Sequence, residues 1–113
     1  MNVKEMSFDF ALKIIRLYKQ LVDKNEFVIS KQLLKSWTSI GANIEEANAG
    51  QSKKDFLSKM SIASKESRET RYWLRLLDQS KIFDIEVKQY LIDIEHLINM
   101  LTKIVKTTAQ KLK

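Results

Sequence analysis

The chain contains no proline and only two glycines in its 113 residues, and both glycines lie between positions 41 and 50. Proline and glycine end helices and build the tight turns that connect short strands. Long stretches without either residue favour helices, whereas a protein of many short strands would lack the turn residues it needs. The sequence therefore predicts a mostly helical chain, and its length suits one domain with its own hydrophobic core.

Apolar residues recur with the period of an α-helix in four segments. These segments cover about residues 7–23, 29–48, 52–79 and 84–110. Ser7, Ser52 and Asp84 are the expected N-caps because their side chains can accept hydrogen bonds from a first helical turn, and Gly50 is placed to act as a left-handed C-cap. Short connections make consecutive helices antiparallel. The predicted fold is therefore all-α, a single-domain, up-down-up-down four-helix bundle.

Each predicted helix has an apolar face for the core. In the first segment this face is assigned to Phe8, Ala11, Leu12, Ile15, Tyr18 and Val22, and in the second to Leu33, Trp37, Ile40, Ile44 and Ala47. In the third and fourth it is assigned to Phe56, Met60, Ala63, Thr70, Trp73, Leu74 and Leu77, and to Val87, Tyr90, Leu91, Ile94, Leu97, Ile98, Leu101, Ile104, Val105 and Leu112. A glycine inside a helix costs about 1 kcal/mol relative to alanine. We therefore expect Gly41 to make room for a neighbouring helix or for the Trp37 ring.

The first segment carries a second apolar stripe beside the first. It consists of Phe10, Ile14, Leu17 and Leu21. A bundle helix normally buries an arc of about 100°, and this helix would bury roughly twice that. The second segment also has small residues on its outer face, including Ser39 and Ala42. Because large exposed apolar patches are uncommon on monomers, both sets are predicted to form an interface between copies of the chain. The alternatives are that the first helix is the most deeply buried helix of a monomer, or that the N-terminal apolar residues are packed by the C-terminal tail.

Two carboxylates, Glu66 and Glu69, lie on or beside the apolar face of the third segment. Carboxylates in a bundle core suggest a di-iron or di-manganese centre, but such a centre needs Glu-x-x-His pairs. The only histidine, His96, has no glutamate at that spacing, and the chain has no glycine-rich phosphate loop and no nucleophile motif. We therefore expect no metal, no cofactor and no catalytic residue. Glu66 and Glu69 are interpreted as partners of basic side chains or of groups such as Ser36 and Asn43.

Basic residues suggest a different kind of partner. Twenty Lys and Arg against fourteen Asp and Glu give a formal net charge of +6, which favours binding to polyanions. Arg68, Arg71 and Arg75 follow one another at helical spacing on the outward face of the third segment, and their forked donors suit phosphate oxygens. Lys13 and Arg16 add positive charge to the first segment. These five residues are the predicted contacts to RNA or DNA, and the alternative is an ordinary solvated charged face.

The sequence contains no charge-free stretch of the roughly 20 residues needed to cross a bilayer. It also begins without an apolar run of signal-peptide length, and it has no cysteine. These features predict a cytoplasmic location and no membrane partner.

Two blocks of the sequence resemble a known family. Residues 39–47 read Ser-Ile-Gly-Ala-Asn-Ile-Glu-Glu-Ala, and residues 65–74 read Lys-Glu-Ser-Arg-Glu-Thr-Arg-Tyr-Trp-Leu. In these blocks, and over nearly its whole length, the chain resembles the bacterial four-helix-bundle family of 23S rRNA-intervening-sequence proteins. Accessory variability proteins of diversity-generating retroelements are related to the same family.

The resemblance implies a cytoplasmic bacterial homopentamer without known catalytic activity. For the retroelement branch it also implies binding of nucleic acid and of a protein partner, a reverse transcriptase. The polar residues that match the family pattern are interpreted as helix-contact residues, and they are Ser36, Ser39, Asn43, Glu46, Glu66, Glu69 and Thr70. Lys35 and Trp37 depart from that pattern, which usually has arginine and a small residue there, so the packing around the second helix is expected to differ.

The function predicted from the sequence is that of a non-enzymatic, homo-oligomeric, pentameric helical bundle that binds RNA or DNA through basic outer helix faces. The alternative is an oligomeric adaptor that binds a protein and no nucleic acid. A metal-dependent bundle enzyme is a remote third possibility.

Overall fold

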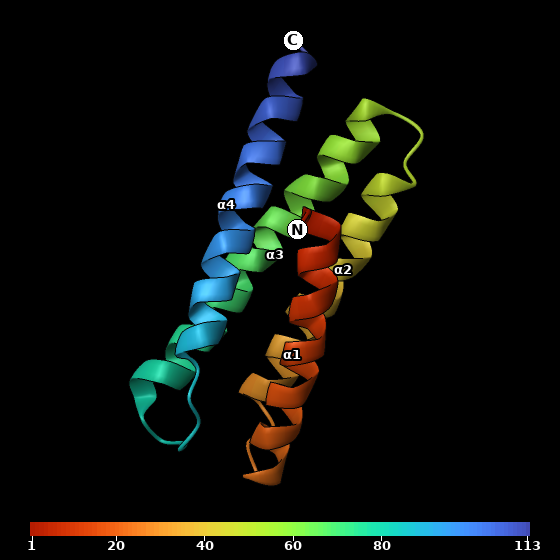
Figure 1. Ribbon diagram of the computed structural model, residues 1–113. Coiled ribbons are helices and arrows are strands. Elements are labelled where there is room, and N and C mark those ends of the chain that lie inside the picture. Colours follow the sequence, from red (N-terminus) through yellow and green to blue (C-terminus); the bar gives the residue numbers. More distant parts are fainter.

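Four helices make up the computed structural model, which describes residues 1–113 (Figure 1). They are α1 (Val3–Asp23), α2 (Ile29–Asn48), α3 (Lys53–Ser80) and α4 (Lys88–Lys111). Consecutive helices run in opposite directions, so the α1–α2 and α3–α4 connections lie at one end and the α2–α3 connection at the other. The predicted all-α, antiparallel four-helix bundle is confirmed.

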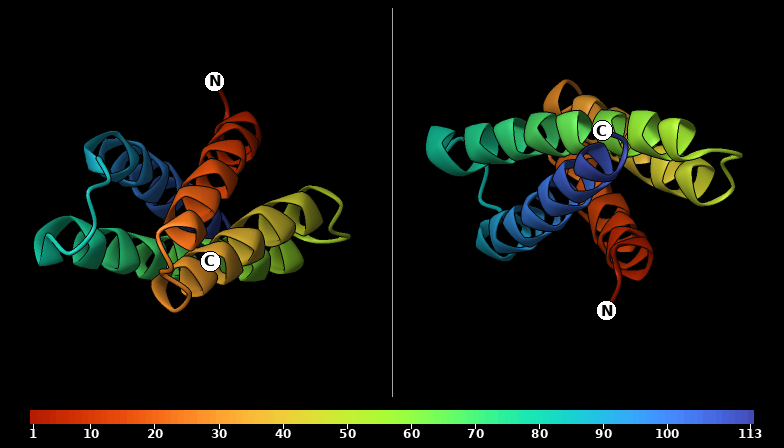
Figure 2. Two further views of the ribbon diagram at one scale, coloured as in Figure 1. Left: turned by 90° about the horizontal axis from the view of Figure 1, so that it is seen from below. Right: turned by 90° about the horizontal axis from the view of Figure 1, so that it is seen from above.

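The four helices pack against one another to different extents. The most extensive packing joins α2 to α3, while α1 packs on α2 and α4 packs on α3. Figure 2 shows α2 and α3 as one layer, with α1 and α4 diverging from each other on one side of it. The contact between α1 and α4 is the least extensive of the four. None of the four helices has the length and apolarity that crossing a membrane requires.

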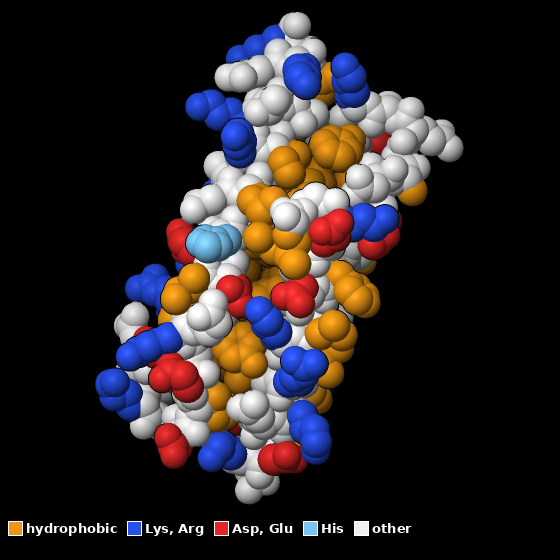
Figure 3. All heavy atoms as spheres, viewed as in Figure 1, with side chains coloured by type: hydrophobic (Ala, Val, Ile, Leu, Met, Phe, Trp, Pro, Cys, Tyr) orange, Lys and Arg blue, Asp and Glu red, His pale blue; other side chains and the backbone are white.

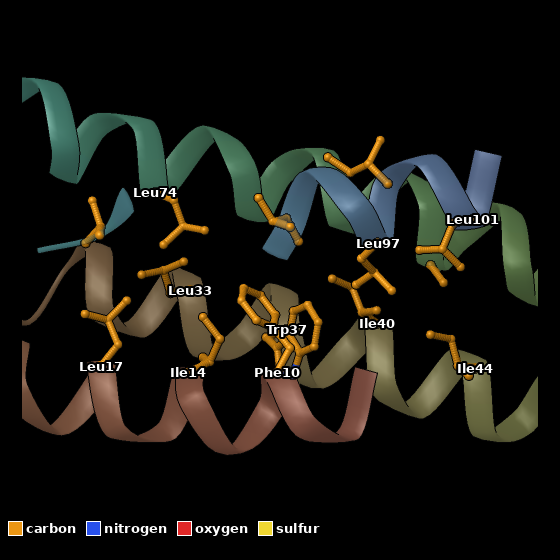
Figure 4. Packing of buried hydrophobic residues seen from close by; sticks show 14 of the residues in the cluster. Phe10, Ile14, Leu17, Leu33, Trp37, Ile40, Ile44, Leu74, Leu97 and Leu101 are labelled. Carbon is orange, nitrogen blue, oxygen red and sulfur yellow. The ribbon is translucent and has the colours of Figure 1, made fainter. Parts of the chain in front are cut away.

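One hydrophobic core runs through the bundle and receives side chains from all four helices. Figure 4 shows residues of α1 and α2 pointing toward Leu74 of α3 and toward Leu97 and Leu101 of α4. Near its centre the ring of Phe10 packs edge-on against Trp37, with the ring centroids 4.4 Å apart and the planes at 73°. Edge-to-face geometry of this kind adds to the stabilisation that aromatic burial alone provides.

The apolar face of α1 that points inward is not the one predicted from the sequence. The buried stripe consists of Phe10, Ile14, Leu17 and Leu21, the residues predicted to join copies of the chain. The stripe predicted to point inward is largely outside, with exposed fractions of 67% for Phe8, 43% for Leu12 and 55% for Ile15. Both stripes have helical spacing, so periodicity alone could not show which of them meets α2 and α4. The assignment of Phe10, Ile14, Leu17 and Leu21 to a subunit interface is therefore wrong.

The helix α1 begins earlier than predicted, and Ser7 is not its N-cap. Asn2 has this role, because its side-chain oxygen accepts a hydrogen bond of 2.8 Å from the backbone N–H of Glu5. Ser7 is buried inside the helix, where its hydroxyl donates to the carbonyl of Lys4. In α3 the predicted cap is present, since Ser52 Oγ accepts from the N–H of Asp55 at 3.1 Å.

The helix α4 begins at Lys88 rather than near residue 84, so Asp84 is not its N-cap. Lys81 ends α3 in the left-handed conformation, with a φ of 56°, and residues 81–87 cross to α4 as an irregular connection. Val87 is buried in this connection, and Phe83 and Ile85 pack against the core. The apolar residues of this connection resembled the start of a helix in the sequence, but Phe83, Ile85 and Val87 pack on the core from an irregular segment.

Neither glycine has the role predicted for it. Gly50 follows α2 without a positive φ, so it is not a left-handed cap. A Cβ atom added to Gly41 would meet nothing within 4 Å, so this glycine makes room neither for Trp37 nor for another helix of the same chain.

The start of α2 depends on a buried carboxylate. Glu26 accepts backbone hydrogen bonds from Val28 at 2.9 Å, Ile29 at 2.7 Å and Ser30 at 2.6 Å. Burial by itself would raise the pKa of Glu26, but the hydrogen bonds from Ser30, Ile29 and Val28 outweigh it and lower the pKa below its usual value. The ionised carboxylate thus satisfies three N–H groups that a helix start otherwise leaves unpaired.

Replacing Glu26 by alanine is expected to lower the free energy of unfolding by about 1–3 kcal/mol at pH 7, because it leaves three buried or half-buried N–H groups without an acceptor. The stabilisation from Glu26 exists above the usual carboxyl pKa and is lost as the pH falls through the lowered pKa of the folded state. Urea unfolding at neutral and acidic pH measures both effects. Glu86→Ala is the control, since Glu86 caps α4 with a single exposed bond to Lys88. Equal losses in the two variants would contradict the assignment.

Candidate nucleic-acid interface

Two of the five basic residues predicted to bind nucleic acid are already paired with carboxylates. Arg71 Nη1 donates to both oxygens of Glu95, at 3.2 and 2.9 Å. Lys13 Nζ lies 3.1 Å from Asp93 and 3.4 Å from Asp9. The hydrogen bond to Asp93 raises the pKa of Lys13, although burial opposes it. Because these cations are partly neutralised within the chain, they attract a phosphate less strongly than an unpaired cation would.

The other three basic residues lack an acidic partner. Arg68 donates from Nη1 to Ser64 Oγ at 2.9 Å and from Nη2 to Thr102 Oγ1 at 3.1 Å. These neutral hydroxyls orient the guanidinium without compensating its charge. Arg75 and Arg16 are exposed and take part in no ion pair. Sequence spacing could have indicated Ser64, four residues before Arg68, whereas Thr102 is on another helix and gives no local signal.

The five residues do not form one surface. Lys13 of α1 meets Asp93 of α4, and Arg71 of α3 meets Glu95 of α4. Residues two apart on a helix point about 200° away from each other, so these ion pairs lie on opposite sides of α4. The arginines of α3 are therefore separated by α4 from the basic residues of α1.

Positive charge continues along α4 beyond Glu95. From His96 to Lys113 the chain has no acidic residue, and none of the lysines in this stretch takes part in an ion pair. Lys106 lies one turn beyond Thr102 and so on the side of α4 that faces Arg68. Figure 3 shows basic side chains gathered at the C-terminal end of α4. Unpaired cations thus lie on the outer side of α3, at Arg68 and Arg75, and on this half of α4.

The polar residues predicted as helix contacts lie along the α2–α3 seam. The hydroxyls of Ser36 and Thr70 are 2.8 Å apart and form a buried hydrogen bond between the helices. Glu46 forms an ion pair of 2.9 Å with Lys59 across the same seam. Asn43 instead donates within α2 to the carbonyl and the hydroxyl of Ser39, at 2.8 and 3.3 Å.

Glu66 and Glu69 have no hydrogen-bond donor from α2, which differs from the expected pairing. Burial raises the pKa of Glu66, and the nearby carboxyl of Glu69 raises it further, while the charges of Lys65 and Lys35 lower it. Across the chain, no three His, Asp or Glu side chains are grouped so that they could hold a metal ion.

The remaining residues predicted to join copies of the chain, Ser39 and Ala42, are on α2. Ala42 is exposed, whereas Ser39 is half-buried and bonded to Asn43. Phe10 contacts Trp37, and Lys4 of α1 forms an ion pair with Glu45 of α2. The outer stripe of α1 therefore runs beside the edge of α2 that carries Gly41.

The profile of the family described as "23S rRNA-intervening sequence protein" matches residues 1–103. The chain belongs to this family. The chain is similar to a protein with unknown function from the S23 ribosomal protein family of Bacteroides thetaiotaomicron VPI-5482, whose crystal structure is known at 1.70 Å resolution. The two sequences are 47% identical. The match has a TM-score of 0.84 and covers 92% of this chain and 95% of that chain. Among curated proteins, no sequence matches.

In this 23S rRNA-intervening sequence protein, Glu66→Gln is expected to raise the melting temperature at pH 7. The pKa of Glu66 is raised in the folded state, so ionisation of this group destabilises the fold as the pH rises through that pKa. The difference between variant and wild type should vanish below the usual carboxyl pKa, and circular dichroism melts at both pH values measure it. Glu95→Gln removes the partner of Arg71 and should have the opposite sign. A Glu66→Gln variant less stable than the wild type at pH 7 would contradict the prediction.

Proposed function

We propose that this chain is a cytoplasmic, non-enzymatic homo-oligomer that binds RNA or DNA through the basic surface of α3 and α4. The observation that carries the proposal is the set of uncompensated cations on that surface, including Arg68, Arg75 and Lys106. Phosphate contacts from such residues supply most of the affinity in sequence-independent nucleic-acid binding. The family resemblance and the absence of cysteine favour the cytoplasmic location.

Self-association is proposed through the outer stripe of α1, consisting of Phe8, Leu12 and Ile15. Three large apolar side chains on one exposed helix face are costly for a monomer in water. Gly41 lies beside this stripe and has open space around it, so the backbone of a second copy could approach closely there. A glycine at this place lowers helix stability without helping the packing of the single chain. The number of five copies rests on the family resemblance.

The variant Ile15→Glu is expected to dissociate the oligomer, since it places a charge in the proposed apolar interface. Sedimentation equilibrium of the full chain measures the mass. Ile92→Glu is a matched control, because Ile92 is an isoleucine of similar exposure, 50%, on a different helix, α4. Ile92→Glu should keep the mass of the wild type. A monomeric wild-type chain, or equal effects of the two variants, would reject the proposed interface.

The double variant Arg68→Gln and Arg75→Gln is expected to weaken binding to RNA or DNA and to reduce the slope of log affinity against log salt concentration by about 2, roughly 1 for each lost phosphate contact. Fluorescence anisotropy at several salt concentrations gives this slope. The charge-matched control is Lys13→Gln with Arg16→Gln on α1, which should leave the slope nearly unchanged. An equal reduction would contradict the location on α3 and α4, and no binding by the wild type at low salt would reject the function.

An adaptor that binds a protein is the second candidate function. It is favoured by exposed apolar residues in the two connections at one end of the bundle, namely Phe27, Val28 and Ile82. An oligomer would present this end once per copy. Co-purification of a protein in preference to nucleic acid, abolished by Val28→Glu, would favour this function.

A further inference from the structure

An exposed aromatic ring lies among the arginines of α3. Tyr72 is 54% exposed, although the ring of a tyrosine could have packed against the core. Arg68 is four residues before Tyr72 and Arg75 is three residues after it, so each lies one helical turn from the tyrosine on the same side of α3. The helical spacing of these arginines predicted a charge stripe without the ring.

The two arginines flanking the ring are the ones without a carboxylate partner. Arg68 is fixed by Ser64 and Thr102, and this uses two of the five N–H donors of its guanidinium. Arg75 is exposed and forms no ion pair. Arg71, by contrast, forms an ion pair with Glu95, which partly compensates its charge. Uncompensated positive charge therefore lies one turn before and one turn after Tyr72, and Glu69, three residues before it, is the carboxylate at the same spacing.

The Tyr72 ring is also held in place. It packs edge-on against Trp73, with the ring centroids 5.2 Å apart and the planes at 69°. Trp73 is half-buried and packs against the core, so it supports the tyrosine from the protein side. An aromatic ring that is already oriented loses little conformational freedom when another ring stacks on it.

We propose that Arg68, Tyr72 and Arg75 form a binding site for single-stranded nucleic acid, in which an unpaired base stacks on Tyr72 and the neighbouring phosphates contact the two guanidiniums. This inference rests on the proposed nucleic-acid binding and specifies its ligand. Aromatic rings beside cations are the usual platform for unpaired bases, because every base has a π-face. In a duplex the base faces are stacked on one another, so the ring adds nothing there and only the arginines contribute.

The test compares a single-stranded RNA of about 12 nucleotides, a DNA of the same sequence and the corresponding duplex DNA, by fluorescence anisotropy with the full-length protein. Tyr72→Ala is expected to weaken binding of both single strands about five- to hundredfold and to leave duplex binding within about twofold. Tyr72→Phe is the matched control and should bind as the wild type does, since it keeps the ring. RNA and DNA single strands should respond alike, because stacking and phosphate contacts do not depend on the 2′-hydroxyl.

Two failures are distinguishable. If the wild type binds none of the three probes, the proposed nucleic-acid function fails, and this site fails with it. If the wild type binds but Tyr72→Ala binds single strands equally well, or loses single-stranded and duplex binding to the same extent, only the stacking site is overturned. Thermal melts of the three proteins show that each is folded at the temperature of the binding assay, and this separates a loss of binding from a loss of fold.

Discussion

The edge-to-face contact between Phe10 and Trp37 sets the rotation of α1 about its own axis, and much of the surface follows from that rotation. With Phe10 against Trp37, the residues one and two turns further along the same stripe also face the core. The same rotation leaves Phe8, Leu12 and Ile15 on the outer face of α1, in contact with water. The same rotation directs Lys13 toward α4, where it meets Asp93, and brings the carbonyl of Lys13 to the hydroxyl of Tyr90 at 3.3 Å.

The distribution of acidic residues along α4 then determines which cations stay free. Asp93 and Glu95 are the last acidic side chains of the sequence, and they form ion pairs with Lys13 on one side and Arg71 on the other. Beyond them, α4 carries no acidic residue that could pair with the arginines of α3. Arg68 therefore meets Thr102 instead of a carboxylate, and its charge remains available to a ligand. The net charge of +6 is therefore unevenly distributed over the surface, because the two ends of α4 differ in their content of acidic residues.

The core faces of α2 and most of those of α3 and α4 could be predicted from the sequence, because each of these helices has a single apolar stripe bordered by polar residues. In α2 the five predicted residues, from Leu33 to Ala47, are all buried. The first helix could not be assigned in this way, since two stripes compete and the choice depends on the shape of Trp37 on another helix. The start of α4 was misplaced because Val87 and its neighbours pack as a loop. Arg71 pairs with Glu95, and Arg68 meets a hydroxyl of Thr102 in place of a carboxylate. Both partners are more than 20 positions away in the sequence, so neither contact could be derived from local spacing.

The two proposed surfaces lie on different parts of the bundle, and this separation has a consequence for affinity. The stripe of Phe8, Leu12 and Ile15 is on α1 beside α2, whereas Arg68, Tyr72 and Arg75 are on the outer side of α3, and the backbones of α1 and α3 are not neighbours. Association through α1 would therefore leave the α3 site uncovered and repeat it once per copy. A single site of one ring and two cations binds weakly, but linked sites bind a long strand with a high effective concentration after the first contact. Binding to long strands should consequently depend on assembly much more than binding to a strand that fills one site.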